Sequence, residues 1–163
     1  MSEQHEVLLR RMQPDDLQAV HDLEQQLFPE DAWPLAGFES ELAQRDTRTY
    51  WVYEDAGRVV GYAGLCVVLP IADVQTIALH PDYQGRGLGR KLLSLLVQTA
   101  GEKNALDVML EVRFDNPTAI GLYESFGFTT IHRLKGYYKG GVDALIMRLP
   151  LDAQHGQEEE RNA

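Results

Sequence analysis

The stretch from Val74 to Gly101 places the strongest constraint on how this chain can fold. An apolar run typical of a strand ends at His80-Pro81, because proline cannot donate to a sheet ladder. Gln84–Gly89 then holds three glycines, and apolar residues at helical spacing predict a helix from Leu88 onward. Glycine permits positive φ and close approach of a ligand, and a helix N-terminus offers N–H groups and partial positive charge. The arrangement therefore predicts a site suited to a pyrophosphate.

The glycine spacing matches neither the dinucleotide-binding pattern nor the Walker loop, and on the glycines alone a tight turn without a ligand is the alternative. The pattern Q-x-x-G-x-G, following an apolar strand and opening a helix, resembles the acetyl-CoA signature of the GNAT superfamily of N-acetyltransferases. Gly85 stands where the family commonly has a basic residue, which predicts one weaker phosphate contact. The resemblance implies that acetyl-CoA is the co-substrate and is bound by Gln84, Gly85, Arg86, Gly87, Leu88, Gly89 and Arg90.

Composition narrows the class of protein. A chain of 163 residues fits one domain, and its net charge of −10 argues against nucleic acid as a direct partner. The acidity fits a cationic acceptor such as an amine or a basic peptide, or it serves only solubility. The sequence shows no long uncharged apolar run and no signal-peptide core, so we expect no membrane association. The single Cys66 excludes an internal disulfide, and we expect a cytoplasmic protein.

The chain order predicts an α/β fold of the α+β kind, with a mixed, mostly antiparallel sheet of about seven strands and about four helices. We expect one GNAT-type domain over residues 1–151 and an acidic, disordered tail over 152–163. The order β-α-α-β-β-β-α-β-α-β-β is that of the GNAT fold. The predicted strands are Val7–Met12, Thr49–Glu54, Val59–Leu69, Ile71–Leu79, Leu106–Val112, Phe128–Leu134 and Val142–Leu149. Helices are predicted from Pro14, over Leu35–Gln44, from Leu88 to about Gly101, and from Asn116-Pro117 to Gly127.

Glu111 is the candidate general base. It interrupts the apolar strand Val108–Val112, so its carboxylate either faces solvent or lines a polar site, where burial would raise its pKa. The sequence LEVR followed by N-x-x-A-x-x-L-Y-E-x-F-G-F resembles RimI-type protein N-acetyltransferases. In that family the glutamate of LEVR acts as base, directly or through water, and the matching residue here is Glu111.

Tyr123 is the candidate general acid for the leaving thiolate, and a core tyrosine is the alternative. It lies about two helical turns after Asn116, so both side chains can face one side of the helix. The resemblance implies that Asn116 and Tyr123 both contact the cofactor. It also implies that backbone amides of Ile77, Ala78 and Leu79 bind the pantetheine arm and the thioester oxygen.

Four aromatic residues are candidates for binding the acceptor. Phe28 and Trp33 interrupt the first helical region, and Tyr137 and Tyr138 precede the last strand. The resemblance to RimI-type enzymes places all four beside a peptide groove. Packing at a helix corner for the first pair, and ordinary hairpin aromatics for the second, are the alternatives.

The leading hypothesis is an enzyme that acetylates the N-terminal α-amine of a protein by direct attack. Cys66 has no base beside it, so we expect no acetyl-enzyme. By family, the acceptor is the N-terminal alanine of a small-subunit ribosomal protein. Acetylation of lysine side chains or of a small-molecule amine is the alternative, and a CoA-binding module that regulates a partner is a third hypothesis.

The sequence offers no metal site and leaves the assembly open. Its five histidines are scattered, without an HxxxH pair or a neighbouring cysteine, so we predict no metal. We expect a monomer or a weak homodimer.

Overall fold

The computed structural model describes residues 6–151, and the tail predicted for residues 152–163 lies outside this range. The predicted order of strands and helices is confirmed, with short 3-10 helices added as η1 (Pro14–Asp16) and η2 (Pro81–Tyr83). The helix predicted from Pro14 therefore begins as η1 and becomes α-helical at Leu17. The strands are β1 (Leu8–Arg11), β2 (Arg48–Asp55), β3 (Arg58–Val68), β4 (Ile71–Leu79), β5 (Asp107–Arg113), β6 (Thr129–Leu134) and β7 (Ala144–Pro150). The α-helices are α1 (Leu17–Leu27), α2 (Leu35–Ala43), α3 (Leu88–Glu102) and α4 (Pro117–Ser125).

The seven strands form one mixed sheet with the order β1-β2-β3-β4-β5-β7-β6. β4 and β5 pair in parallel from Ile71–Asp107 to Asp73–Met109, as expected for strands joined by the α3 crossover. β7 pairs antiparallel with both β5 and β6. The predicted α/β class with a mostly antiparallel sheet is thereby confirmed.

The described chain divides into two compact units. The first contains the residues up to Cys66 together with Gln75–Ser94, and the second contains Val67–Val74 and the residues from Leu95 onward. The glycine-rich turn belongs to the first unit, whereas β5, α4 and the last two strands belong to the second.

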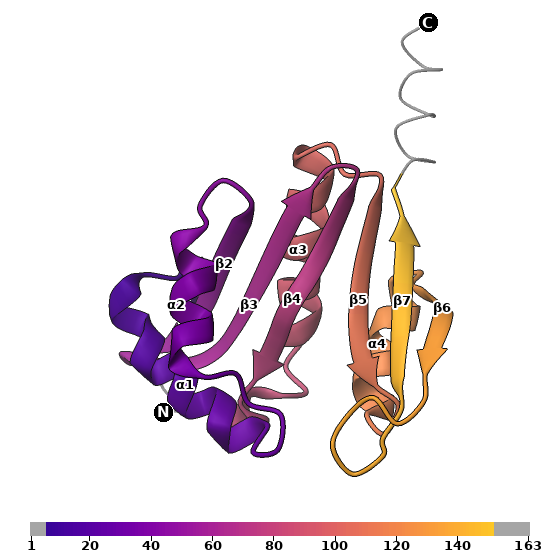
Figure 1. The fold of residues 1–163 in the computed structure, drawn as a ribbon. Coiled ribbons are helices and arrows are strands. Elements are labelled where there is room, and N and C mark those ends of the chain that lie inside the picture. Colours follow the sequence, from indigo (N-terminus) through magenta and orange to yellow (C-terminus); the bar gives the residue numbers. More distant parts are fainter. Residues whose placement is uncertain (1–5, 152–163) are drawn as a thin grey trace, which may run out of the picture. The chain divides into compact units, whose positions relative to one another are not determined.

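The first unit is built around an aromatic core. In Figure 1, α1 and α2 lie side by side in front of β2. Gly64 on β3 makes room for the Tyr50 ring, since an added Cβ would lie 2.2 Å from that ring. The central members of this core are Met12, Val20, Leu23, Phe38, Tyr50, Val52, Tyr62 and Ala78.

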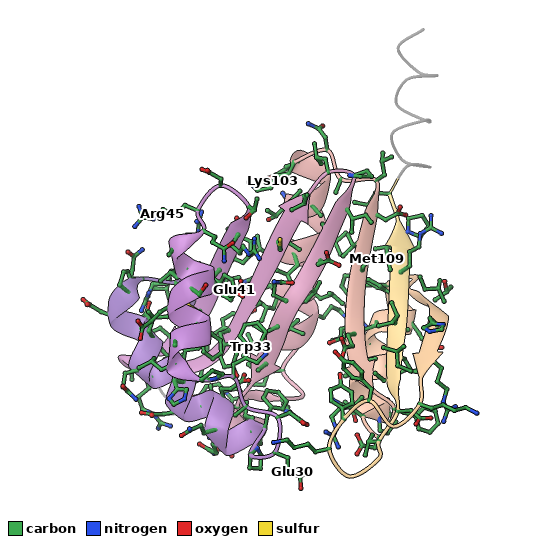
Figure 2. The ribbon with its side chains drawn as sticks, viewed as in Figure 1. Glu30, Trp33, Glu41, Arg45, Lys103 and Met109 are labelled. Atoms are coloured by element: carbon green, nitrogen blue, oxygen red, sulfur yellow. The ribbon has the colours of Figure 1, made fainter. Side chains whose placement is uncertain are left out.

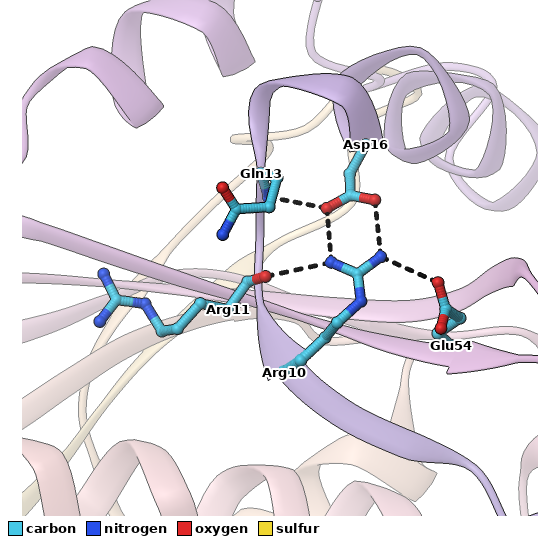
Figure 3. A network of polar contacts seen from close by, with 5 residues as sticks. All are labelled: Arg10, Arg11, Gln13, Asp16 and Glu54. Atoms are coloured by element: carbon cyan, nitrogen blue, oxygen red, sulfur yellow. Dashed lines mark hydrogen bonds and ion pairs between the residues drawn. The ribbon is translucent and has the colours of Figure 1, made fainter.

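Arg10 ties the first strand to its neighbours (Figure 3). Its guanidinium donates to both carboxylate oxygens of Asp16 at 2.8 Å and to Glu54 at 3.0 Å. Asp16 also accepts the backbone N–H of Gln13 at 2.7 Å. The hydrogen bond from Arg10 is the main reason that the pKa of Asp16 is lowered.

The second unit packs α4 behind the β5–β7 pair (Figure 1). Along β5, Val108, Leu110 and Val112 are buried, as the strand period of two requires. Arg148 on β7 donates to Asp107 on β5 at 2.8 Å. Residues 6–151 contain no helix that is long and apolar enough to cross a membrane.

Candidate active site

The predicted pyrophosphate turn has the backbone that such a site needs. Gly85 and Gly87 have φ values of 78° and 80°, in the region where side chains are strained. A Cβ added at either glycine would have no neighbour within 4 Å, so the turn is open at both positions. The backbone N–H of Lys91 donates to the carbonyl of Gly87 at 3.1 Å, so the amides of Gly87, Leu88 and Gly89 precede the helical ladder of α3. These N–H groups can serve as donors to an anion.

Two tyrosines that the sequence analysis missed hold this turn in place. Tyr53 on β2 donates to the carbonyl of Leu88 at 2.8 Å, and Tyr83 donates to Asp55 Oδ2. Asp55 Oδ1 is buried without a hydrogen-bond partner in the part of the chain that the structure describes. Arg86, predicted to add charge for a phosphate, donates to the Asp82 carbonyl and stacks 4.9 Å from the centre of the Tyr83 ring.

The three β4 residues predicted to bind acetyl-CoA through their backbone amides differ in the burial of their side chains. Ala78 is buried in the core, whereas Ile77 and Leu79 are half-buried. Gln84 donates to the Leu79 carbonyl at 3.2 Å and so links the end of β4 to the glycine turn. The backbone of this segment therefore leads directly into the turn.

The segment between α1 and α2 is fixed by a carboxylate in the core. Trp33 precedes α2, and Glu41 lies further along that helix (Figure 2). Glu24 is 4% exposed, accepts the Tyr62 hydroxyl at 2.5 Å and accepts the backbone N–H of Trp33 at 3.0 Å. Burial of Tyr62 is the main cause that raises the pKa of its hydroxyl, and the negative charge of Glu24 is the next.

Both aromatic residues of this segment contribute to packing, which was the alternative to a binding role. Phe28 and Trp33 are partly buried against the core, and the Trp33 ring lies 5.1 Å from the Phe38 ring. The position of Glu24 among Val20, Leu23 and Leu27, on the apolar face of α1, was the sequence signal that could have revealed its burial.

In the second unit, Glu111 is exposed, unlike its neighbours Leu110 and Val112 on β5. Of the two predicted alternatives, the structure therefore shows a carboxylate that faces solvent. It is not alone on that face, because Tyr138 donates its hydroxyl to Glu111 Oε1 at 2.8 Å. Tyr137 is 56% exposed, and its ring packs edge-on against Tyr138 with centroids 5.2 Å apart.

Arg113 and Asp115 are further residues that the sequence analysis did not assign. The Arg113 guanidinium lies 5.0 Å from the centre of the Tyr138 ring. It also binds both oxygens of Asp115 at 2.9 and 3.1 Å, which lowers the pKa of Asp115. The R-x-D spacing at the end of a strand was the available signal, although it does not identify the tyrosine.

Asn116 and Tyr123 occupy opposite ends of α4. Asn116 caps the helix, as predicted, by accepting the N–H of Ala119 at 3.2 Å, and Pro117 is the first helical residue. Tyr123 is 5% exposed, with its ring 6.0 Å from that of Phe128. Burial raises the pKa of Tyr123 to about 12.

Within residues 6–151 we find no cluster of three or more side chains suited to a metal. The predicted site residues fall in both units. The first unit carries Phe28, Trp33, Ile77, Ala78, Leu79 and residues 84–90, and the second carries Glu111, Asn116, Tyr123, Tyr137 and Tyr138.

Comparison with known proteins identifies the family to which this chain belongs. A model of the acetyltransferase (GNAT) family matches residues 17–128. The chain belongs to the GNAT acetyltransferases. The family resemblance inferred from the glycine turn is therefore confirmed, and so is an acetyltransferase as the class of enzyme.

The relatives include RimI enzymes. The N-alpha-acetyltransferase RimI of Mycobacterium tuberculosis (strain ATCC 25618 / H37Rv) is 42% identical over 139 residues, covering 82% of this chain and 85% of that protein. The ribosomal protein bS18-alanine N-acetyltransferase of Escherichia coli (strain K12) is 36% identical over 145 residues, covering 86% and 95%. The crystal structure of an Escherichia coli ribosomal-protein-S18-alanine N-acetyltransferase matches with a TM-score of 0.81 at 34% identity, covering 90% of this chain and 94% of that one. The resemblance to RimI-type enzymes is thus confirmed.

Proposed function

We propose that this acetyltransferase transfers the acetyl group of acetyl-CoA to the N-terminal α-amine of a protein. The observation that carries the proposal is the exposed Glu111 carboxylate on β5 of a GNAT chain, which is a base suited to an α-amine. The names of the relatives support the N-terminal alanine of a small-subunit ribosomal protein as the acceptor. An enzyme with that acceptor works in the cytoplasm. We expect it to contact no nucleic acid directly and to act as a monomer or weak homodimer.

The glycine turn supplies the binding site for acetyl-CoA. Its open positive-φ glycines and the leading amides of α3 fit a pyrophosphate, and Arg86 and Arg90 add positive charge. When bound, acetyl-CoA supplies an activated acetyl thioester. The amides of Ile77, Ala78 and Leu79 then orient the pantetheine arm and polarise the thioester carbonyl. Asn116 adds a contact to the same arm.

Glu111 takes the proton from the attacking amine. Freeing an α-amine at pH 7 costs about 1 kcal/mol, whereas freeing a lysine side chain costs about 4.6 kcal/mol. A solvent-exposed carboxylate is a weak base and therefore suits the first acceptor far better than the second. The new N–C bond forms as the C–S bond breaks, so no residue of the enzyme carries the acetyl group.

Tyr123 stabilises the leaving thiolate as a hydrogen-bond donor and gives its proton to sulfur, and the phenolate regains a proton from solvent after CoA leaves. Its pKa of about 12 keeps the phenol protonated at neutral pH. A free thiol has a pKa of about 8.5, and burial in the same surroundings raises that value too. Phe28, Trp33 and Tyr137 contact the acceptor peptide in this proposal, and Tyr138 lies beside Glu111.

The acceptor class can be tested by mass spectrometry with a panel of acceptors. We expect acetylation of a short peptide that begins with alanine, and at least tenfold slower reaction when the first residue is changed to a large one. A small diamine at the same concentration should remain unmodified. Equal rates across the peptides, or efficient acetylation of the diamine, would overturn the proposed acceptor.

A further inference from the structure

Glu111 and Arg113 lie two residues apart on β5, so their side chains project from the same face of the sheet. Tyr138 lies over both of them. Its hydroxyl donates to Glu111 Oε1 at 2.8 Å, while its ring lies against the Arg113 guanidinium. A carboxylate that accepts a directed hydrogen bond cannot rotate as freely as one that contacts only water.

Tyr138 is itself held firmly. Its backbone N–H donates to Val142 at 3.0 Å, and its carbonyl accepts the N–H of Gly141 at 3.1 Å. Tyr137 packs against one edge of its ring. Arg113 is in turn fixed by its two hydrogen bonds to Asp115. The hydroxyl therefore has a defined direction, set by four residues around it.

The segment that carries Tyr138 does not need the bond to Glu111 for its position. Asp143 accepts the N–H of Gly136 at 2.8 Å and the side chain of Arg133 at 2.6 Å. Phe114, next to Arg113 on the chain, donates to the Asp143 carbonyl at 2.9 Å. Because these bonds already tie residues 133–143 together and to the end of β5, the Tyr138–Glu111 bond is available for another role.

We propose that Tyr138 is a positioning residue that orients the Glu111 carboxylate for proton abstraction, with Arg113 and Asp115 holding the tyrosine ring. Oε1 is then the anchored oxygen, and Oε2 is the oxygen that receives the proton. This inference rests on the proposed function, in which Glu111 is the base. It changes the predicted role of Tyr138 from contact with the peptide to control of the base.

The chemistry of Tyr138 suits this role. Burial, and next the hydrogen bond to Glu111, raise the pKa of Tyr138. Its hydroxyl therefore stays protonated and remains a donor throughout the neutral range. It does not compete with Glu111 for the proton of the amine.

The test is a double-mutant cycle on peptide acetylation with Tyr138→Phe and Glu111→Gln. Tyr138→Phe keeps the ring against Arg113 and Tyr137 and removes only the donor. We expect kcat to fall about tenfold, with the KM values for peptide and acetyl-CoA changed less than twofold. In the Glu111→Gln background, the same substitution should cause no further loss, because Tyr138 acts through that carboxylate.

Tyr50→Phe is the matched control, since it removes a tyrosine hydroxyl that also donates to a glutamate, Glu41, at 2.8 Å, within the first compact unit. It should leave kcat unchanged. A rise in peptide KM with kcat intact in Tyr138→Phe, equal losses in both backgrounds, or no loss at all would each overturn the proposal. Full activity of Glu111→Gln alone would instead remove the proposed base, and the failure would lie with the proposed function.

Crystal structures of the wild-type chain and Tyr138→Phe give a readout that does not depend on activity. We expect one Glu111 conformer in the wild type and several in the variant. The same single Glu111 conformer in both would contradict a positioning role.

Discussion

At the scale of single residues, the two predicted catalytic groups have opposite surroundings. Glu111 faces solvent on β5, whereas Tyr123 on α4 is 5% exposed. Freeing an α-amine at pH 7 costs only about 1 kcal/mol, so an exposed carboxylate suffices for the role proposed for Glu111. Burial raises the pKa of Tyr123, which keeps the phenol neutral and able to donate a hydrogen bond in its proposed role.

The role proposed for Tyr123 predicts a selective loss of kcat in Tyr123→Phe. We expect kcat to fall about 100-fold, with acetyl-CoA binding by calorimetry changed less than threefold, because only the hydroxyl is removed. Since the pKa of Tyr123 is about 12, its proton is retained up to about pH 10. The wild-type rate should therefore show no loss between pH 8 and 10 from this group. An unchanged kcat in the variant would exclude Tyr123 as the donor.

The residue contacts in this region were only partly predictable. The strand predicted around LEVR and the helix predicted after Asn116 are present as β5 and α4, and the catalytic roles of Glu111 and Tyr123 stay predictions. The sequence could not pair Tyr138 with Glu111, because these residues are 27 positions apart and belong to a strand and a separate loop. Nor did it separate the two neighbouring tyrosines, of which Tyr138 contacts Glu111 and Tyr137 is largely exposed.

At the scale of secondary-structure elements, the segment between α1 and α2 depends on one buried carboxylate. Glu24 satisfies the hydroxyl of Tyr62 and the backbone N–H of Trp33. A buried charge with two donors is tolerated, whereas buried donors left without an acceptor are costly. The segment that carries Trp33 is therefore coupled to β3 through α1.

Glu24→Ala should lower the free energy of unfolding by on the order of 3 kcal/mol, because the buried Tyr62 hydroxyl and the partly buried Trp33 N–H both lose their acceptor. Tyr62→Phe should cost only about 1 kcal/mol, since it removes one donor and leaves the Trp33 bond intact. Urea denaturation of both variants would measure the difference. If the two variants were equally stable, the carboxylate would not be what holds this segment.

Element types were predicted well because each rests on local chemistry. Proline and glycine end β4 and open α3, and Asn116-Pro117 opens α4, so these boundaries need no tertiary information. The sequence did not predict the start of α1 as well, because the chain makes a turn of 3-10 helix from Pro14 to Asp16 before the α-helix begins. The burial of Glu24 was not predicted, because glutamate is ordinarily exposed and the Tyr62 hydroxyl that it accepts lies 38 positions further along the chain.

At the scale of the whole molecule, buried tyrosines and paired carboxylates determine how stability varies with pH. Burial raises the pKa of Tyr53 and of Tyr123 to about 12. Above about pH 10 the unfolded chain loses these protons first, so the folded state loses stability as the pH rises toward 12. Asp16 behaves in the opposite sense, because Arg10 lowers its pKa. The stability that Asp16 contributes is present above about pH 4 and is lost as the pH falls through the pKa of Asp16 in the folded state.

We therefore expect thermal stability to be highest between about pH 5 and 9 and to fall on both sides. Scanning calorimetry from pH 3 to pH 11 would measure this profile. Asp16→Asn should lower the melting temperature at pH 7 and flatten the acidic limb, while leaving the alkaline limb unchanged. A melting temperature that keeps rising above pH 10 would contradict the assigned tyrosine environments.

The most direct test of the central claim uses one peptide that carries both acceptors. It would begin with a free alanine and contain one internal lysine, and fragmentation by tandem mass spectrometry would locate the acetyl group after reaction with acetyl-CoA. The proposed function predicts acetylation of the α-amine, with the lysine unmodified. Acetylation of the lysine, with the α-amine left free, would contradict it.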